Sequence, residues 1–373
     1  MRVGIVGVTA VGATARGRGR TVLLSALAAL VAVRIGVAQT PINRPANLEP
    51  VPMTHVLHPG TAPGGAPRPP STPQGGTVAA GGTLPPSAGL TITPTFDSTI
   101  TSDPNAAAIE NAINTAIANI QSVFSDPITV TIKFQAMTSG LGQSSTFVYG
   151  YPYSSYLASL KADAKTSDDA TAVALLPNAS TNPVNGNSLI YVKPANLRAV
   201  GIAQNPPPGQ FDGVIGVNTL ITTPGSPGTS GQYSLLDTVE HEINEVLGLG
   251  SALPNVYQQT GTICPEDLFR YSGPRTRSFT TTDSRTSGVF AFFSIDANFS
   301  LAQFDNQNDG GDFGDWQSNP LPTGVTPKVQ DAFATPGANP TETVELTALD
   351  VIGYDRVTLI LPLPPTNVRI LRK

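Results

Sequence analysis

The sequence LLDTVEHEINEVLGLGS, residues Leu235–Ser251, is the one stretch in this chain that combines a helical period with reactive side chains. Its apolar residues recur at the spacing of one helix face. They are Leu235, Leu236, Val239, Ile243, Val246 and Leu247. His241 and Glu245 are four residues apart near the opposite side, so both side chains can reach one point in space. The stretch therefore predicts a helix over about 235–247 with two ligands for one metal ion.

Glu242 directly follows the first of these ligands. In zinc peptidases the glutamate after the first histidine is the general base for the water molecule that the metal activates. The usual motif is His-Glu-x-x-His, whereas Glu245 stands here in the fifth position. A carboxylate also binds zinc, but its negative charge makes the metal a weaker Lewis acid. The alternative interpretation is an amphipathic helix whose His/Glu face is solvated.

A third protein ligand must come from elsewhere in the chain. His241 is the last histidine in the sequence, so this ligand has to be a carboxylate or a hydroxyl, unless water takes its place. Asp267 is the first candidate, because it follows the helix by about twenty residues and a returning segment could reach the cleft. Its alternative role is that of a capping aspartate or the partner of Arg270.

An acidic, glycine-rich stretch, FDNQNDGGDFGDW, follows at residues 304–316. Its aspartates are Asp305, Asp309, Asp312 and Asp315. Several oxygen ligands on a loop suit calcium, so a second metal site that binds Ca²⁺ is one hypothesis. A turn rich in Asx residues, with no metal, is another. A third is that Asp312 or Asp315 reaches the metal at His241.

The first 91 residues are predicted to lie outside the folded domain. Three arginines, the apolar run 21–33 and small residues at 36–38 form the pattern of a secretory signal peptide over 1–38. Residues 39–91 are rich in Pro, Gly, Ser and Thr, which predicts a disordered linker. His55 and His58 fall in this stretch, where flanking prolines disfavour a helix, so we expect both in solvated coil.

Composition excludes several classes of protein. The net charge is −5 and only 13% of residues are charged, which argues against a nucleic-acid partner. The single cysteine excludes an intrachain disulfide framework and any multi-cysteine metal site. After the signal peptide is removed, no apolar stretch is long enough to cross a bilayer.

Residues 92–356 are predicted to form one α+β domain, followed by a tail over 357–373. Asp103 and Pro104 are typical of a helix start, and an apolar stripe at 109, 113, 117, 120 and 124 continues that helix. Alternation predicts a strand at 128–134. Further helices are expected at 153–164, 168–176 and 343–351, and strands at 189–192 and 214–217. We expect the strand at 214–217 to be the edge strand that pairs with an extended substrate.

Seven stretches in order resemble a family of secreted bacterial zincin-like metalloproteases, often found with PEP-CTERM sorting tails. They are GLGQSST (140–146), AKTSDDATAVALLP (164–177), TVEHEINEVLGLGS (238–251), DLFRYS (267–272), FSIDANFSLAQF (293–304), GGDFGDW (310–316) and ELTALDVIGYD (345–355). The family's helix motif resembles His-Glu-x-x-Glu-Val-x-Gly. The resemblance spans about residues 90–355. This chain shows no sorting tail after Tyr354, so we expect release rather than anchoring.

The resemblance implies a zincin-like single domain with a mixed sheet, a central active-site helix and a loop-rich C-terminal part. It also implies zinc as cofactor, with His241 and Glu245 as ligands and Glu242 as catalytic base. The sequence thus predicts a secreted metal-dependent endopeptidase whose partner is a protein or peptide substrate. The alternative is a catalytically inactive, zincin-derived extracellular binding or surface module, stabilised by calcium.

Overall fold

A computed structural model describes residues 49–61, 89–225, 228–253 and 262–357. These residues form a mixed α+β fold built on a mixed sheet, which confirms the predicted class. The predicted signal peptide lies outside the described residues, as does nearly all of the predicted tail. No helix within the described ranges combines the length and apolar character that a membrane span requires.

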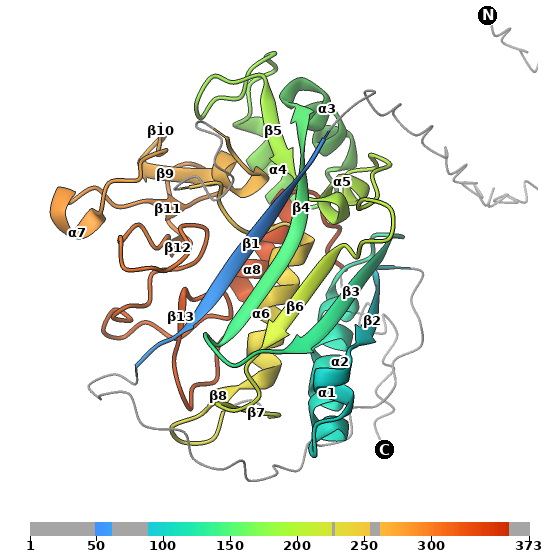
Figure 1. The fold of residues 1–373 in the computed structure, drawn as a ribbon. Helices are drawn as coiled ribbons and strands as arrows, with labels where there is room; N and C mark the ends of the chain where they lie inside the picture. The colour runs from blue at the N-terminus through green and yellow to red at the C-terminus, as the bar shows by residue number, and fades with distance from the viewer. Residues whose placement is uncertain (1–48, 62–88, 226–227, 254–261, 358–373) are drawn as a thin grey trace, which may run out of the picture. The chain divides into compact units, whose positions relative to one another are not determined.

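A seven-stranded sheet is the framework of the domain (Figure 1). Its strands are β1 (Pro50–Pro59), β2 (Thr91–Phe96), β3 (Thr129–Ala136), β4 (Gly142–Pro152), β5 (Leu189–Val192), β6 (Gly213–Val217) and β13 (Phe333–Ala334). The order across the sheet is β13-β1-β4-β6-β3-β2, and β5 pairs with the end of β4. Strands β2, β3 and β6 are parallel, whereas β4 runs antiparallel to both β6 and β1.

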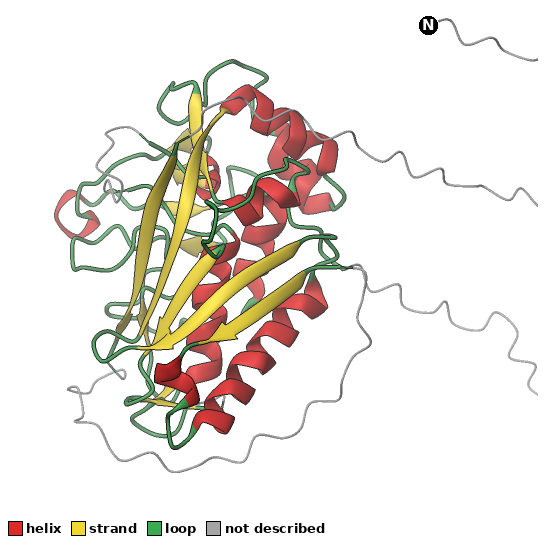
Figure 2. Cartoon of the chain, turned by 45° about the vertical axis from the view of Figure 1, so that its right-hand side comes forward, coloured by secondary structure: helices red, strands yellow, loops and turns green. Residues whose placement is uncertain are grey.

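The long helices gather on one face of this sheet (Figure 2). The helices are α1 (Ser98–Thr101), α2 (Ala106–Val123), α3 (Tyr153–Asp163), α4 (Ser167–Ala174), α5 (Pro194–Ala199), α6 (Leu235–Leu247), α7 (Ser284–Ser287) and α8 (Thr343–Val351). Helix α6 packs on β4 and β6 and against α2. The predicted apolar stripe of α2 is confirmed, because Ile109, Ile113, Ile117 and Ile120 are all buried.

Between α6 and α8 the chain is loop-rich, as predicted. It contains the 3-10 helix Pro265–Phe269 and the short strands β9 (Arg270–Gly273), β10 (Thr276–Arg277), β11 (Phe292–Phe293) and β12 (Ala302–Gln303). The pair β7 (Thr222–Thr223) and β8 (Tyr233–Ser234) precedes α6. Phe293, Phe304 and Trp316 pack against one another, with ring centroids 5.1–6.3 Å apart. This aromatic cluster fixes both ends of the acidic loop predicted at 304–316.

The predicted edge strand at 214–217 is not an edge strand. It corresponds to β6, which is hydrogen-bonded to β3 on one side and to β4 on the other. A strand with two neighbours has no free backbone groups for a substrate. The sequence pattern identified a strand correctly, but alternation along one strand carries no information about its position in the sheet.

The structure also corrects the linker predicted over 39–91. Residues 50–59 form β1, which pairs with β4 from Pro50↔Tyr149 to Leu57↔Gly142. Met53, His55 and Leu57 are buried at period two, which is the pattern of a half-buried strand. The prolines stand at 50, 52 and 59, towards the ends of the strand, where they disturb the ladder least. The high Pro, Gly, Ser and Thr content of residues 39–91 outweighed this short alternating pattern in the sequence-based prediction.

A cluster of carboxylates around Asp126, which includes Asp163 and Asp355, makes the stability of the fold depend on pH. Burial raises the pKa of Asp126 from 3.8 to about 7. The hydrogen bond that Asp126 accepts from the Asp355 N–H lowers this pKa, but by less than burial raises it. The folded chain therefore binds a proton between about pH 4 and 7 that the unfolded chain has lost, so stability falls as pH rises through this window.

We expect Asp126→Asn to reduce this fall by on the order of 2–4 kcal/mol, because the amide has no proton to lose. Urea unfolding at pH 5 and pH 8 measures the difference for both proteins. An equal loss of unfolding free energy in the wild type and the variant would contradict the assignment.

Candidate metal centre

Helix α6 is buried on every side, including the face that carries its polar residues. Ser234 caps its start by accepting a hydrogen bond from the Asp237 N–H, and the helix ends at Gly248. His241, Glu242 and Glu245 are each 0% exposed. The alternative prediction of a solvated His/Glu face is therefore wrong, and these polar groups must be satisfied inside the protein.

His241 is oriented so that one ring nitrogen faces two carboxylates. Its Nδ1–H donates to the carbonyl oxygen of Val329 at 2.8 Å, which leaves the lone pair on Nε2. Nε2 lies 3.4 Å from Glu245 Oε1 and 3.6 Å from Asp315 Oδ2. A metal-binding histidine is commonly held in this way, with its second nitrogen bonded to a carbonyl.

The spacing of the three atoms fits a zinc site. Ligand atoms about 2.1 Å from a tetrahedral zinc ion lie about 3.4 Å from one another. The two distances measured from His241 are close to this value, and all three ligand atoms lie within 4.8 Å of each other. One imidazole and two carboxylates are also a donor set that zinc accepts.

Several atoms around this point lack partners. Glu245 Oε1, Asp315 Oδ2 and Gln330 Oε1 are buried without a hydrogen bond. The other oxygen of Glu245 accepts from the hydroxyl of Ser144 on β4 at 2.5 Å. The Gln330 amide nitrogen lies 3.1 Å from His241 Nε2 and 2.9 Å from Asp315 Oδ1. Unpaired buried oxygens that converge on one point are what a cation would satisfy.

Glu242 lies between α6 and β4, and both of its carboxylate oxygens are buried and unpaired. The strand leaves room for it through Gly142, where a Cβ would collide with Glu242 Oε1. Burial, followed by repulsion from Glu245, raises the pKa of Glu242 well above its ordinary value. A raised pKa is the property that a glutamate needs to accept and then release a proton near neutral pH.

Asp315, rather than Asp267, is the third member of the group. Asp267 accepts hydrogen bonds from the Ser251 hydroxyl and from the backbone N–H groups of Ala252 and Cys264. Both of its oxygens are thus used to cap the 3-10 helix and hold the chain after α6. Asp267 also joins no group of ligand atoms with His241 among the described residues, so the structure contradicts its predicted role as a ligand and shows the alternative role as a capping residue.

The four aspartates of the acidic loop do not converge on one site. Among the described residues, no three of Asp305, Asp309, Asp312 and Asp315 lie within 4.8 Å of each other. Asp309 accepts from the Gly311 N–H and the Asn319 amide, whereas Asp312 contacts His55. The loop sends Asp315 to His241, which was the third hypothesis for this stretch, whereas calcium binding by the loop stays a prediction.

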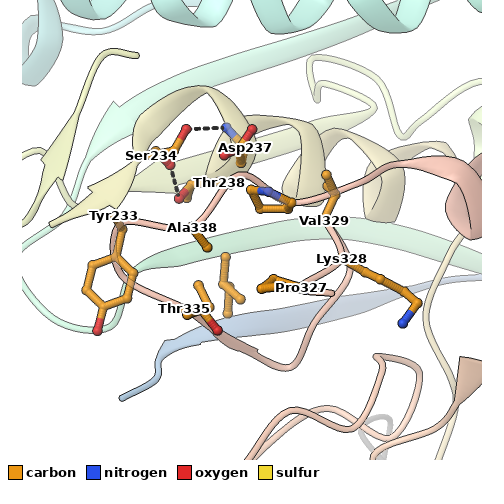
Figure 3. A pocket seen from close by; sticks show the side chains of 12 residues that line it. Tyr233, Ser234, Asp237, Thr238, Pro327, Lys328, Val329, Thr335 and Ala338 are labelled. Atoms are coloured by element: carbon orange, nitrogen blue, oxygen red, sulfur yellow. Dashed lines mark hydrogen bonds between the residues drawn. The ribbon is translucent and has the colours of Figure 1, made fainter. Parts of the chain in front are cut away.

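Two cavities border the site. The smaller is about 20 Å³ and lies at the start of α6, where Figure 3 shows Thr238, Val329 and Ala338 around it. This volume holds about one water molecule, so it does not admit a peptide. The larger is about 270 Å³ and is lined by His55, His58 and Asp312, among others. It connects the surface with the β1 side of the metal centre.

Zinc affinity of two variants tests whether Asp315 or Asp267 is the third ligand. We expect Asp315→Asn to weaken zinc binding by at least about tenfold, because an amide is a poorer ligand than a carboxylate. Asp267→Asn should leave zinc affinity unchanged and instead lower thermal stability, because it removes a capping acceptor. Competition with a chromogenic chelator measures the affinities. The reverse pattern would return the ligand role to Asp267.

Comparison of the chain with protein-family models, curated proteins and solved structures found no match. The resemblance to a zincin-like family therefore stays a prediction. What the centre can do has to be argued from its own geometry: a buried imidazole, two carboxylates at zinc-ligand spacing and an unpaired glutamate beside them.

Proposed function

We propose that this protein is an exported zinc-dependent endopeptidase with a zincin-like site. One observation carries the proposal: His241, Glu245 and Asp315 converge at the spacing of zinc ligands, with the unpaired Glu242 one residue along the helix. A zinc ion held by the three would polarise a substrate carbonyl and make water more acidic. Export is proposed from the signal pattern at 1–38.

Glu242 is the proposed proton carrier. Its carboxylate takes a proton from the attacking water and then gives that proton to the amine that leaves. Residues around it keep the site dry and fixed: Gly142 makes room for it, and Ser144 holds Glu245 from the opposite strand. Exclusion of water strengthens the electrostatic contacts inside the site.

Strand β4 is the proposed support for an extended peptide. It borders α6, and its edge nearest the metal centre carries β1 as an antiparallel neighbour along eight residue pairs. Peptides commonly bind to enzymes by adding a strand to such an edge. In the described arrangement β1 takes this place and His55 covers the centre, so a substrate requires β1 to move aside.

The complete burial of His241, Glu242 and Glu245 also favours the second candidate, a binding module without turnover. If the protein is such a module, β1 stays paired with β4 and the carboxylates serve only to hold a cation. The two candidates differ in whether Glu242 is needed for hydrolysis and in whether β1 leaves β4.

Replacement of the base tests the first difference. We expect Glu242→Gln to lower the rate of peptide hydrolysis by about 10²–10⁴-fold, because the amide accepts no proton. Zinc content, measured by elemental analysis, should stay unchanged. Glu240→Gln is the matched control, because Glu240 points away from the site to the Asn119 amide on α2. Full activity in Glu242→Gln would remove the proposed base.

A disulfide between β1 and β4 tests the second difference. Thr54 and Ser145 are cross-strand partners whose hydroxyl oxygens lie 3.1 Å apart. Thr54→Cys with Ser145→Cys should therefore bring the two sulfur atoms within reach of a disulfide. We expect the oxidised variant to lose hydrolysis of a casein substrate and a phosphine reductant to restore it. Thr54→Cys alone is the control. Undiminished hydrolysis by the fully cross-linked protein would show that β1 does not occupy the substrate's place.

A further inference from the structure

The centre contains a second group of metal-ligand atoms beside the first. His55, Glu245 and Asp312 each place one such atom within 4.8 Å of the others. The first group is His241, Glu245 and Asp315, so Glu245 belongs to both. Among the described residues, no single group of this kind contains both histidines. The two groups are therefore neighbouring sites that share one carboxylate.

We propose that the chain binds a second zinc ion, held by His55, Asp312 and the shared carboxylate of Glu245. One imidazole and two carboxylates are a donor set that zinc accepts. The neighbouring ion is the zinc proposed at His241. This inference therefore rests on the proposed function in one respect, namely that a zinc ion binds there. The second site lies on β1 and would fasten this strand to the domain.

An unpaired buried nitrogen of His55 marks the second site, and the shared Glu245 supplies the unpaired oxygen that also faces His241. His55 is 1% exposed, and its Nε2 has no hydrogen-bond partner. Its Nδ1 contacts Asp312 Oδ2, while Asp312 Oδ1 accepts from the Gly314 N–H. Glu245 Oε1 is likewise buried and unpaired. Histidine nitrogens and carboxylate oxygens that remain unpaired inside a protein need an explanation, and a bound cation provides one.

The local charge also calls for more than one dication. Glu245, Asp312 and Asp315 bring three carboxylates into a small volume, and Asp312 and Asp315 are at most 8% exposed at their side chains. The nearest buried ammonium, Lys193, donates to the backbone carbonyls of Glu245 and Leu249 rather than to a carboxylate. Three carboxylates at such burial are costly, and two zinc ions would offset their charge.

The larger cavity gives the second ion a route and room for water ligands. It is about 270 Å³ and is lined by both His55 and Asp312. A water molecule takes about 30 Å³ of liquid volume, so the cavity can hold several. Zinc bound by three protein atoms commonly keeps a water in its fourth position.

Metal stoichiometry tests the proposal on the full-length chain. After saturation with zinc and removal of excess, we expect two zinc ions per wild-type chain by elemental analysis. His55→Ala and Asp312→Asn should each retain one. His58→Ala is the matched control and should retain two, because His58 lines the same cavity but stacks on Phe333 at 5.2 Å instead of joining a group.

The outcomes separate this inference from the proposed function. One zinc in the wild type that survives His55→Ala but is lost on His241→Ala would overturn the second site and leave the first intact. One zinc lost in either variant would mean that both histidines hold a single ion, which also overturns it. Two ions that both survive His241→Ala would instead remove the first site. Circular dichroism confirms that each variant is folded.

Cobalt provides a readout that requires no mutation. Two ions that share a carboxylate lie about 3.5–4 Å apart in known two-metal sites, which couples their electron spins. We expect the paramagnetic resonance signal per cobalt to fall as loading rises from one to two equivalents. A signal that grows in proportion to both equivalents would show that the ions are isolated and that Glu245 does not bridge them.

Discussion

The structure depends on how buried carboxylates of α6 are compensated. Glu242 and Glu245 are fully buried between the helix and β4, where an isolated negative charge is very unfavourable. Their surroundings are arranged around this constraint: Gly142 leaves space for one carboxylate and the Ser144 hydroxyl donates to the other. Both oxygens of Glu242 and Oε1 of Glu245 have no hydrogen-bond partner, and Glu245 Oε1 lies 3.4 Å from His241 Nε2. A bound cation would compensate these buried charges. The packing of α6 on β4 and the metal hypothesis therefore depend on the same carboxylates.

Three segments that are distant in sequence complete the centre. Strand β1 brings His55, the acidic loop brings Asp312 and Asp315, and the segment before β13 brings the Val329 carbonyl and Gln330. Each segment is held by its own interactions, which are the β1–β4 ladder, the aromatic cluster around Trp316 and a parallel bridge between Trp316 and Asp331. Strand pairing, ring packing and this bridge therefore position the candidate ligands, which is how a site keeps its geometry.

This arrangement links the proposed activity to the N-terminal strand. The same edge of β4 that would receive an extended peptide is paired with β1, and the same strand carries a ligand-type histidine into the centre. Peptide access and cation binding at His55 are thus opposed within one element. The larger cavity beside His55 shows where solvent already reaches this boundary. The smaller cavity, at the start of α6, is too small to admit more than about one water molecule.

The sequence by itself determined the local elements. The bounds of α6, the stripe of α2 and the i, i+4 placement of His241 and Glu245 follow from helical periodicity, which acts over a few residues. The sequence also favoured Asp267 as the third ligand, which the structure contradicts. It offered Asp315 only as one of several hypotheses. Tertiary structure alone decided between them, placed β6 inside the sheet and turned residues 50–59 into a strand with a buried histidine. The reason is physical: strand order and ligand convergence depend on contacts between segments up to about 260 residues apart, as between His55 and Asp312, and no local pattern records them.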